Sequence, residues 1–300
     1  MIPVSALILE SRFEMTEIRF SLPGAWCRFC VAGSVLAAVC LHGDGAAAQG
    51  KLEARYTALL GGLPIGRGHW AIEIGENQFT AAASGVTTGL MTVFTNGQGS
   101  GAARGLVRGD KLVPTVFASS VSHDNRIDEL RMVLSGGTVK ELFVDPPVQP
   151  NPQRIPVTEA QRRGVLDPMS AALVHVAGSP DPVSPEACRR TIPVFDGRMR
   201  FDLHLSFKRF ERVQSESGYQ GQVAVCGVQF VPLGGYVPDR YVVKYLMAQR
   251  EMEIWLAPIA GTRIVVPYRI SLQTPLGTGV LAATTFVTTP TPRPTTSAAR

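Results

Sequence analysis

The histidine residues are the first candidates for metal chemistry in this sequence. A zinc site would need His, Cys, Asp or Glu at ligand spacing, as in an HExxH helix. The histidines beyond residue 48 are far apart in the sequence, at His69, His123, His175 and His204. Asp202 and His204 fall on one face of a predicted strand, but such a pair is typical of an exposed polar face. The sequence therefore predicts no metal site.

A glycine-rich stretch, residues 97–101, is the closest approach to a nucleophile or phosphate motif. It differs from the serine-hydrolase pattern GxSxG because Gln98 stands two residues before Ser100. As a dinucleotide fingerprint it would have to join a parallel strand to a helix, and no βαβ pattern surrounds it. We interpret the stretch as a flexible glycine loop and expect no cofactor.

Three carboxylates are weaker candidates for catalytic residues. Asp181, Glu186 and Asp196 are candidates for the pair that glycoside cleavage requires. No motif links them, so no catalytic residue is assigned and the favoured interpretation is a protein without enzymatic activity. A hydrolase acting on envelope polymers stays open as one hypothesis.

Cysteine usage suggests an oxidising compartment. Three of the five cysteines, Cys27, Cys30 and Cys40, lie in the first 48 residues, and Cys188 and Cys226 remain. One pair in an exported chain predicts a structural disulfide, with two buried free thiols as the alternative.

The first 48 residues have the pattern of a secretory signal. Arg19 and Arg28 precede an uncharged stretch, residues 29–41, that is shorter than the about 20 residues needed to span a bilayer. Ala46–Ala48 supplies the small residues of a cleavage site before Gln49. We therefore expect a periplasmic mature chain with no transmembrane span; a buried N-terminal helix is the alternative.

The residue before Cys40 bears on lipid anchoring. Cleavage for lipidation favours Gly, Ala or Ser at that position, whereas this chain has Val39. The sequence therefore argues against lipoprotein anchoring.

Composition indicates a β-rich globular chain and not a nucleic-acid-binding one. Hydrophobic residues make up 45% of the chain and charged residues 18%, with a net charge of +5. Thirty glycines and 22 prolines interrupt the sequence too often for long helices. The basic residues are scattered and form no stripe with aromatic residues, so we expect no nucleic-acid partner.

Apolar and polar residues alternate with a period of two from residue 52 to residue 144. Trp70, Ile72 and Ile74, for example, share a face opposite Ala71 and Glu73. Turn-forming residues separate the alternating segments, as in an antiparallel meander with one apolar face. The fold class expected is mainly β, a curved antiparallel half-barrel or spiral with one or two short helices.

The second half of the chain continues this pattern after irregular segments. The proline-rich residues 145–156 are predicted to form a surface loop. Asp167 and Pro168 predict the start of a short helix that ends at Gly178. Strands are predicted at residues 190–206 (turning at Asp196-Gly197), 221–231, 252–256, 263–272 and 279–287, whereas the pattern at 241–251 fits helix or strand.

The domain organisation follows from these elements. Residues 1–48 form the predicted signal peptide and residues 49–287 a single β-rich domain. Residues 288–300 are rich in proline and threonine and are predicted to be a disordered tail.

Several short motifs follow one another along the chain. They are the stretch from Tyr56 to Gly66 with Leu60, Gly61, Gly62 and Ile65; Asp167–Ala171; Cys188–Leu203; Cys226 with Gly234-Gly235-Tyr236; Ile254–Leu256; and Val266–Ile270. Together they resemble the motifs of domain-of-unknown-function family 3108, a family of exported bacterial envelope proteins. The family is similar in outline to periplasmic lipoprotein carriers, which form curved antiparallel half-barrels around a hydrophobic cleft. The resemblance supplies no catalytic residues.

The matching residues also have structural explanations. Gly61, Gly62 and Gly66 suit sharp turns, Asp167 suits a helix cap, and Asp196-Gly197 suits a hairpin turn. The concave face predicted by the pattern is therefore either a pocket or a filled core.

The functional hypothesis is a non-enzymatic periplasmic protein of the cell envelope that binds a lipid-like or other hydrophobic ligand on its concave sheet. The alternative partner is an envelope protein or peptidoglycan, contacted by the outer face or the tail.

Overall fold

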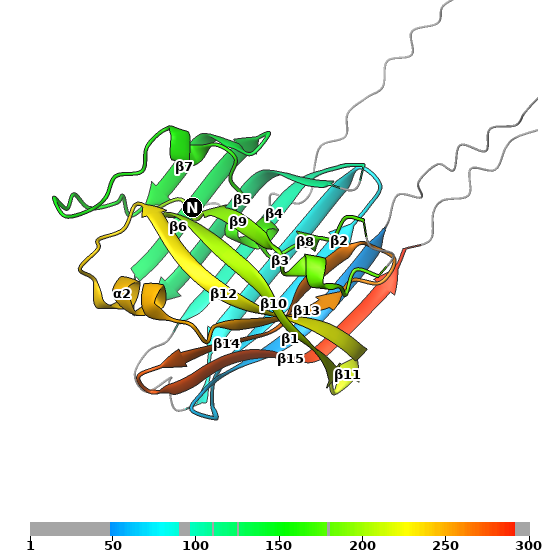
Figure 1. The fold of residues 1–300 in the computed structure, drawn as a ribbon. Coiled ribbons are helices and arrows are strands. Elements are labelled where there is room, and N and C mark those ends of the chain that lie inside the picture. Colours follow the sequence, from blue (N-terminus) through cyan, green and yellow to red (C-terminus); the bar gives the residue numbers. More distant parts are fainter. Residues whose placement is uncertain (1–48, 90–96, 110, 125, 179–180, 292–300) are drawn as a thin grey trace, which may run out of the picture. The chain divides into compact units, whose positions relative to one another are not determined.

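A computed structural model describes residues 49–291, except 90–96, 110, 125 and 179–180 (Figure 1). The chain divides into the units Met1–Asp44 and Gly45–Arg300, and every described residue belongs to the second. The predicted signal peptide, residues 1–48, lies outside the described residues, as do residues 292–300 of the predicted tail.

The first seven strands form an antiparallel meander in which each strand pairs with the next. They are β1 (Gly50–Leu60), β2 (Leu63–Ile74), β3 (Gln78–Thr87), β4 (Gln98–Arg108), β5 (Lys111–His123), β6 (Arg126–Ser135) and β7 (Thr138–Asp145). Glycines with positive φ make the tight turns, as at Gly61 (φ 56°) and Gly62 (φ 86°) between β1 and β2. In β1 buried and exposed residues alternate, which confirms the period of two.

The second half of the chain adds its strands to the other side of β1. The order runs from β1 through β15, β14, β13, β12 and β10 to β9. Two short strands lie off this path: β11 pairs with β15 in parallel and β8 with β14. The remaining elements are η3 (Ala160–Arg162), α1 (Pro168–Ala171), β8 (Val174–His175), η4 (Pro185–Ala187), β9 (Arg190–Phe195), β10 (Arg200–Gln214), β11 (Ser217–Gly218), β12 (Gln220–Gly234), α2 (Tyr241–Ala248), β13 (Glu253–Pro258), β14 (Ile264–Thr274) and β15 (Gly277–Pro290).

The sheet curls so that its two halves face each other across a shared core. In Figure 1 the strands β9, β10 and β12 lie in front of the β1–β7 meander. Leu52 and Ile72 of the meander belong to the same buried cluster as Val223 of β12 and Val266 of β14. The predicted mainly β, curved antiparallel fold with short helices is confirmed.

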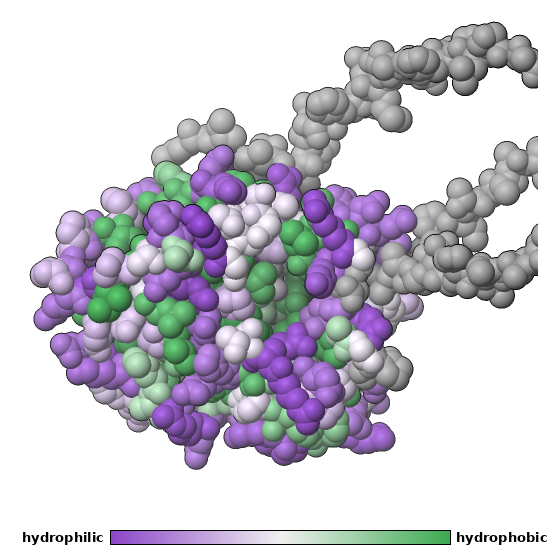
Figure 2. Space-filling view, turned by 45° about the horizontal axis from the view of Figure 1, so that its top comes forward, coloured by the Kyte–Doolittle hydropathy of each residue, from purple (hydrophilic) through white to green (hydrophobic). Residues whose placement is uncertain are grey.

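The strand β12 is buried on both faces. Val223 and Val225 belong to the core inside the curl, which we call the inner core, whereas Ala224 and Cys226 belong to a second cluster outside it. Segments around α1, β8 and η4 cover this second face. Figure 2 shows hydrophobic residues in a recess near the middle of the viewed face, with hydrophilic residues around it.

The predicted disulfide between Cys188 and Cys226 is confirmed. Their Cα atoms are 5.3 Å apart and both side chains are fully buried in the second cluster. The bond joins the end of η4 to the middle of β12 and so fixes the covering segment to the sheet.

The predicted helix from Asp167 to Gly178 is wrong in length. Asp167 caps α1, since its Oδ1 accepts hydrogen bonds from the backbone N–H of Met169 (3.0 Å) and Ser170 (2.9 Å). The helix nevertheless ends at Ala171, and β8 then pairs with the start of β14. Strand pairing therefore overrides the helical spacing of the apolar residues in this segment.

Two other segments also differ from expectation. The predicted glycine loop, residues 97–101, lies within or directly before β4, paired with β3 and β5. Thr288–Pro290 of the predicted tail extends β15, because these residues pair with the start of β1. The ambiguous residues 241–251 form α2 as far as Ala248.

Across the described ranges, none of the helices is both long and apolar enough to span a membrane.

Candidate functional site

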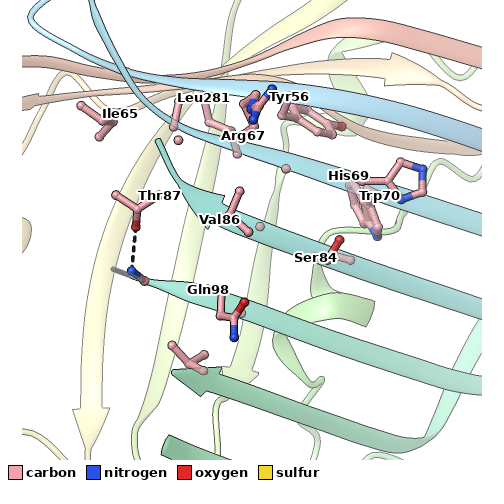
Figure 3. A pocket seen from close by; sticks show the side chains of 18 of the residues that line it. Tyr56, Ile65, Arg67, His69, Trp70, Ser84, Val86, Thr87, Gln98 and Leu281 are labelled. Atoms are coloured by element: carbon pink, nitrogen blue, oxygen red, sulfur yellow. Dashed lines mark hydrogen bonds between the residues drawn. The ribbon is translucent and has the colours of Figure 1, made fainter. Parts of the chain in front are cut away.

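A cavity of about 490 Å³ opens on the inner face of the sheet, at the end of the meander where β1 turns into β2 (Figure 3). Strands β1 to β5 form one side and β14 and β15 contribute the other. We call it the glycine trough, and its inner-face lining comprises Tyr56, Ala58, Gly66, Gly68, Trp70, Ala83, Gly85, Thr87, Gly97, Gly99, Val121 and Leu281. Val121 and Leu281 are 45% and 36% exposed, so solvent reaches the trough.

The trough exists because a row of glycines occupies adjacent strands in register. Gly68 of β2 pairs with Gly85 of β3, and Gly85 pairs with Gly99 of β4. Alternation places this row on the same face as Trp70 and Ala83. The neighbouring part of the inner face carries core side chains. The glycine row carries no side chains, so the space in front of it stays open.

Backbone crowding does not require glycine at two of these positions. A Cβ added to Gly85 would meet its nearest heavy atom, the Arg67 carbonyl oxygen, at 3.5 Å, and one added to Gly99 would meet Val121 Cγ2 at 3.4 Å. Both are ordinary van der Waals distances, and neither glycine has a positive φ. Gly105, deeper in the core, is different, because a Cβ there would collide with Phe79 and with the β5 backbone.

Two aromatic residues form the inner end of the trough. Tyr56 is 6% exposed, and its hydroxyl donates a 2.7 Å hydrogen bond to the carbonyl oxygen of Pro267. Burial raises the pKa of Tyr56 far above its usual value, so the phenol is neutral at physiological pH. The bond also ties β1 to β14 across the cavity.

Trp70 contributes the unsatisfied polar group of this wall. It is 8% exposed, and its buried Nε1–H has no hydrogen-bond partner among the residues that the structure describes. A buried indole N–H usually finds an acceptor. One buried donor in this wall of the trough is therefore unused.

Charged side chains lie on the opposite face of the same strands. Arg67 and His69 also border the cavity, but by alternation they belong to the outer face of β2, where His69 Nε2 is 2.8 Å from Glu53 Oε2. Lys51 and Glu73 form another outer ion pair at 2.9 Å. The inner face is therefore suited to an apolar group.

The glycines singled out by the sequence have different roles. Gly61 and Gly62 form the β1–β2 turn with positive φ. Gly66 does not form a turn: it lies within β2, pairs with Ala58 and Thr87, and lines the trough. A Cβ there would lie 3.1 Å from the Val86 carbonyl oxygen, so the close approach of β3 explains this glycine.

The turn between β9 and β10 is built on Asp196 and Gly197. Asp196 Oδ1 accepts hydrogen bonds from the backbone N–H of Arg198 (2.8 Å) and Met199 (2.6 Å), and Gly197 has φ 87°. Burial raises the pKa of Asp196, although these hydrogen bonds oppose the shift.

The three carboxylates considered for hydrolysis each have local partners. Asp181 accepts from the backbone N–H of Val183 (2.8 Å), Glu186 pairs with Arg189 (3.0 Å), and Asp196 supports its own turn. Within the described ranges no three His, Cys, Asp or Glu side chains cluster at metal-ligand distances.

The trough itself was not predicted from the sequence. Its signal is the alternation of small residues at Gly97, Gly99, Gly101 and Ala103, which has the period of a strand. The interpretation of residues 97–101 as a loop concealed that period.

Comparison with known proteins places the chain in a family without an assigned activity. A family model described as a protein of unknown function (DUF3108) matches residues 54–284. No curated protein matches the chain. Among solved structures, a β-barrel-like protein of the domain of unknown function DUF1849 from Brucella abortus has a TM-score of 0.43 and 11% identity, covering 81% of this chain and 98% of that one.

Proposed function

The chain belongs to the DUF3108 family, and we propose that it is a non-enzymatic periplasmic protein that binds a lipid-like ligand in the glycine trough. The observation that carries the proposal is the in-register row Gly68–Gly85–Gly99 on the inner face. Glycine inside a strand destabilises it by about 0.5–1 kcal/mol relative to alanine. Glycine in such a position is typical of sites where another group approaches the backbone closely.

The chemistry of the walls favours a ligand with an apolar chain. The glycine trough has a volume of about 490 Å³, which is within the usual range for small-molecule sites. The ligand would displace water from the apolar surface of Val121, Leu281 and the glycine row. The unpaired Nε1–H of Trp70 would donate to one oxygen of an ester or carboxyl group on that ligand.

A periplasmic location is supported by the buried Cys188–Cys226 bond, because disulfides form and persist in oxidising compartments. It also agrees with the signal pattern of residues 1–48.

Filling the trough tests the proposal. The variants Gly99→Val and Gly85→Val/Gly99→Val add side chains on the inner face, where a Cβ at either position comes no closer than 3.5 Å to the backbone of a neighbouring strand. We expect binding of the neutral dye N-phenylnaphthylamine, measured by fluorescence titration, to weaken at least about tenfold, whereas the free energy of unfolding stays equal or rises because valine favours strands.

Ser100→Val is the matched control. Ser100 is the next residue on β4, is exposed on the opposite face and does not line the trough. Its variant should bind the dye as the native chain does. Equal dye affinity in Gly99→Val, Ser100→Val and the native chain would contradict the proposal.

A further inference from the structure

Two adjoining cavities of about 420 and 380 Å³ lie away from the glycine trough, with which they share no lining residue. They are bounded by the segment after β7, the β9–β10 turn and the chain between β12 and α2. Both are lined by Pro147, Val148, Arg154, Arg198 and Gly235, so we treat them as one site and call it the arginine cavity.

Positive charge predominates in the lining of the arginine cavity. Four arginines line it, Arg154, Arg162, Arg198 and Arg240, against the single carboxylate of Asp196. That carboxylate is already engaged by two backbone N–H groups of its own turn. Among the residues that line the cavity, cationic groups therefore outnumber anionic ones.

Existing contacts hold Arg198 and Arg154 in place. Arg198 Nη2 pairs with Asp128 Oδ1 at 2.9 Å, and Arg154 Nη1 donates to the Gly235 carbonyl oxygen. Arg162 Nη1 is 3.6 Å from Glu159 Oε1, which is beyond hydrogen-bond distance.

Two guanidinium donors of arginines that line the cavity have no partner among the described residues. The Nε atoms of Arg154 and Arg162 are buried and have no hydrogen-bond partner in the described part of the chain. Buried donors of charged groups are normally satisfied, and a guanidinium presents Nε and Nη together as a fork for an oxyanion.

The rest of the lining is apolar. Val144, Val157 and Phe195 contribute to the smaller cavity, and Val237 and Val243 to the larger one. An oxyanion placed here would lie in partly desolvated surroundings, where charge-assisted hydrogen bonds are strengthened.

We propose that the arginine cavity binds an oxyanion, a phosphate or carboxylate group, through Arg154 and Arg162, with the apolar lining accepting any short hydrocarbon attached to it. The proposal rests on the cavity, the excess of arginines and the two unpaired donors. It does not depend on occupation of the glycine trough.

The test is calorimetric titration of the full mature chain with inorganic phosphate, octyl phosphate and octanoate, with neutral octyl glucoside as reference. Arg162→Gln removes one donor fork, and its weak contact to Glu159 means that little of the fold depends on it. Affinity for the anionic probes should fall at least about tenfold, as expected for a lost charge-assisted hydrogen bond.

Arg163→Gln is the matched control, because it removes the same charge from the adjacent exposed residue, which does not line the cavity. It should leave affinity within about twofold of the native value. Each titration is repeated in Gly85→Val/Gly99→Val, which removes binding in the trough. Thermal melting of every variant confirms that it is folded.

The probes separate the two sources of the anion. Inorganic phosphate binding as tightly as octyl phosphate identifies a free anion, whereas tighter binding of octyl phosphate or octanoate identifies an amphiphile. Absence of binding by all three anions, or equal losses in Arg162→Gln and Arg163→Gln, would overturn the proposal.

Discussion

Single residues on the inner face decide where this sheet is filled and where it is hollow. Leu52 and Phe79 fill the middle of the curl, whereas Gly68, Gly85 and Gly99 leave its end open on strands of the same meander. A Cβ would fit at Gly85 and Gly99, so these two glycines are not needed for the backbone conformation. Their effect is to leave the space in front of the strands empty.

Asp167 leads to a prediction about how the stability of the folded chain depends on pH. It is 0% exposed, and burial raises its pKa above the ordinary 3.8, although hydrogen bonds to Ser170 and Met169 oppose the shift. The folded chain therefore holds this proton to a higher pH than the unfolded chain, and stability from this residue falls as the pH rises from 3.8 through the raised pKa.

Asp167→Asn keeps a good helix cap but has no proton to lose. We expect it to gain stability relative to the native chain as the pH rises through that window, and to change in parallel with it elsewhere. Urea denaturation at a series of pH values measures the difference. Asp167→Ala, which also loses the cap, should be about 1 kcal/mol less stable than Asp167→Asn throughout. A relative loss of stability in Asp167→Asn over the same window would contradict the assignment.

At the scale of elements, period-two alternation predicted most of the strands because strands such as β1 have one buried and one exposed face. It could not predict α1 and β8 correctly, since Leu173 packs into the inner core while Val174 and Val176 pack into the second cluster. Which of the two clusters each of these side chains joins depends on strands that are distant in the sequence. The glycines of β4 were misassigned for a similar reason, because pairing on both sides compensates for their low strand propensity.

The site was less predictable than the fold. The sequence correctly paired Cys188 with Cys226 because two cysteines allow one pairing. The trough depends on the register that aligns Gly68, Gly85 and Gly99, and no local pattern specifies a register across three strands.

The disulfide provides a prediction for the element that covers β12. The cysteines are 38 residues apart in sequence, and removing a bond of that span lowers the free energy of unfolding by about 2–4 kcal/mol. Urea denaturation of Cys188→Ala/Cys226→Ala should show this loss, and the native chain treated with reductant should show most of it. Unchanged stability in both would mean that η4 and β12 stay together without the bond.

At the scale of the whole molecule, β1 joins two sheet halves that enclose one core. Its pairing with β2 and β15 places the trough where both halves contribute, since Leu281 of β15 faces Ala58 of β1. A ligand bound there would contact residues from both ends of the sequence.

Export is tested on the intact molecule. Protein recovered from the periplasm of an expressing bacterium should have the mass of a chain that begins at Gln49 and lacks the two hydrogens lost on joining Cys188 to Cys226. A mass that includes residues 1–48, or retention of the protein in the cytoplasm, would contradict the proposed location.

Fluorescence quenching at Trp70 tests the central claim most directly. The mature chain has two tryptophans, Trp70 in the wall of the trough and Trp255 outside its lining. Methyl dibromostearate, an uncharged acyl chain with a heavy-atom quencher, should quench the native chain, and Trp70→Phe and Gly85→Val/Gly99→Val should each abolish the quenching. Quenching that persists in Trp70→Phe, or that valines in the trough leave unchanged, would show that acyl chains do not bind there.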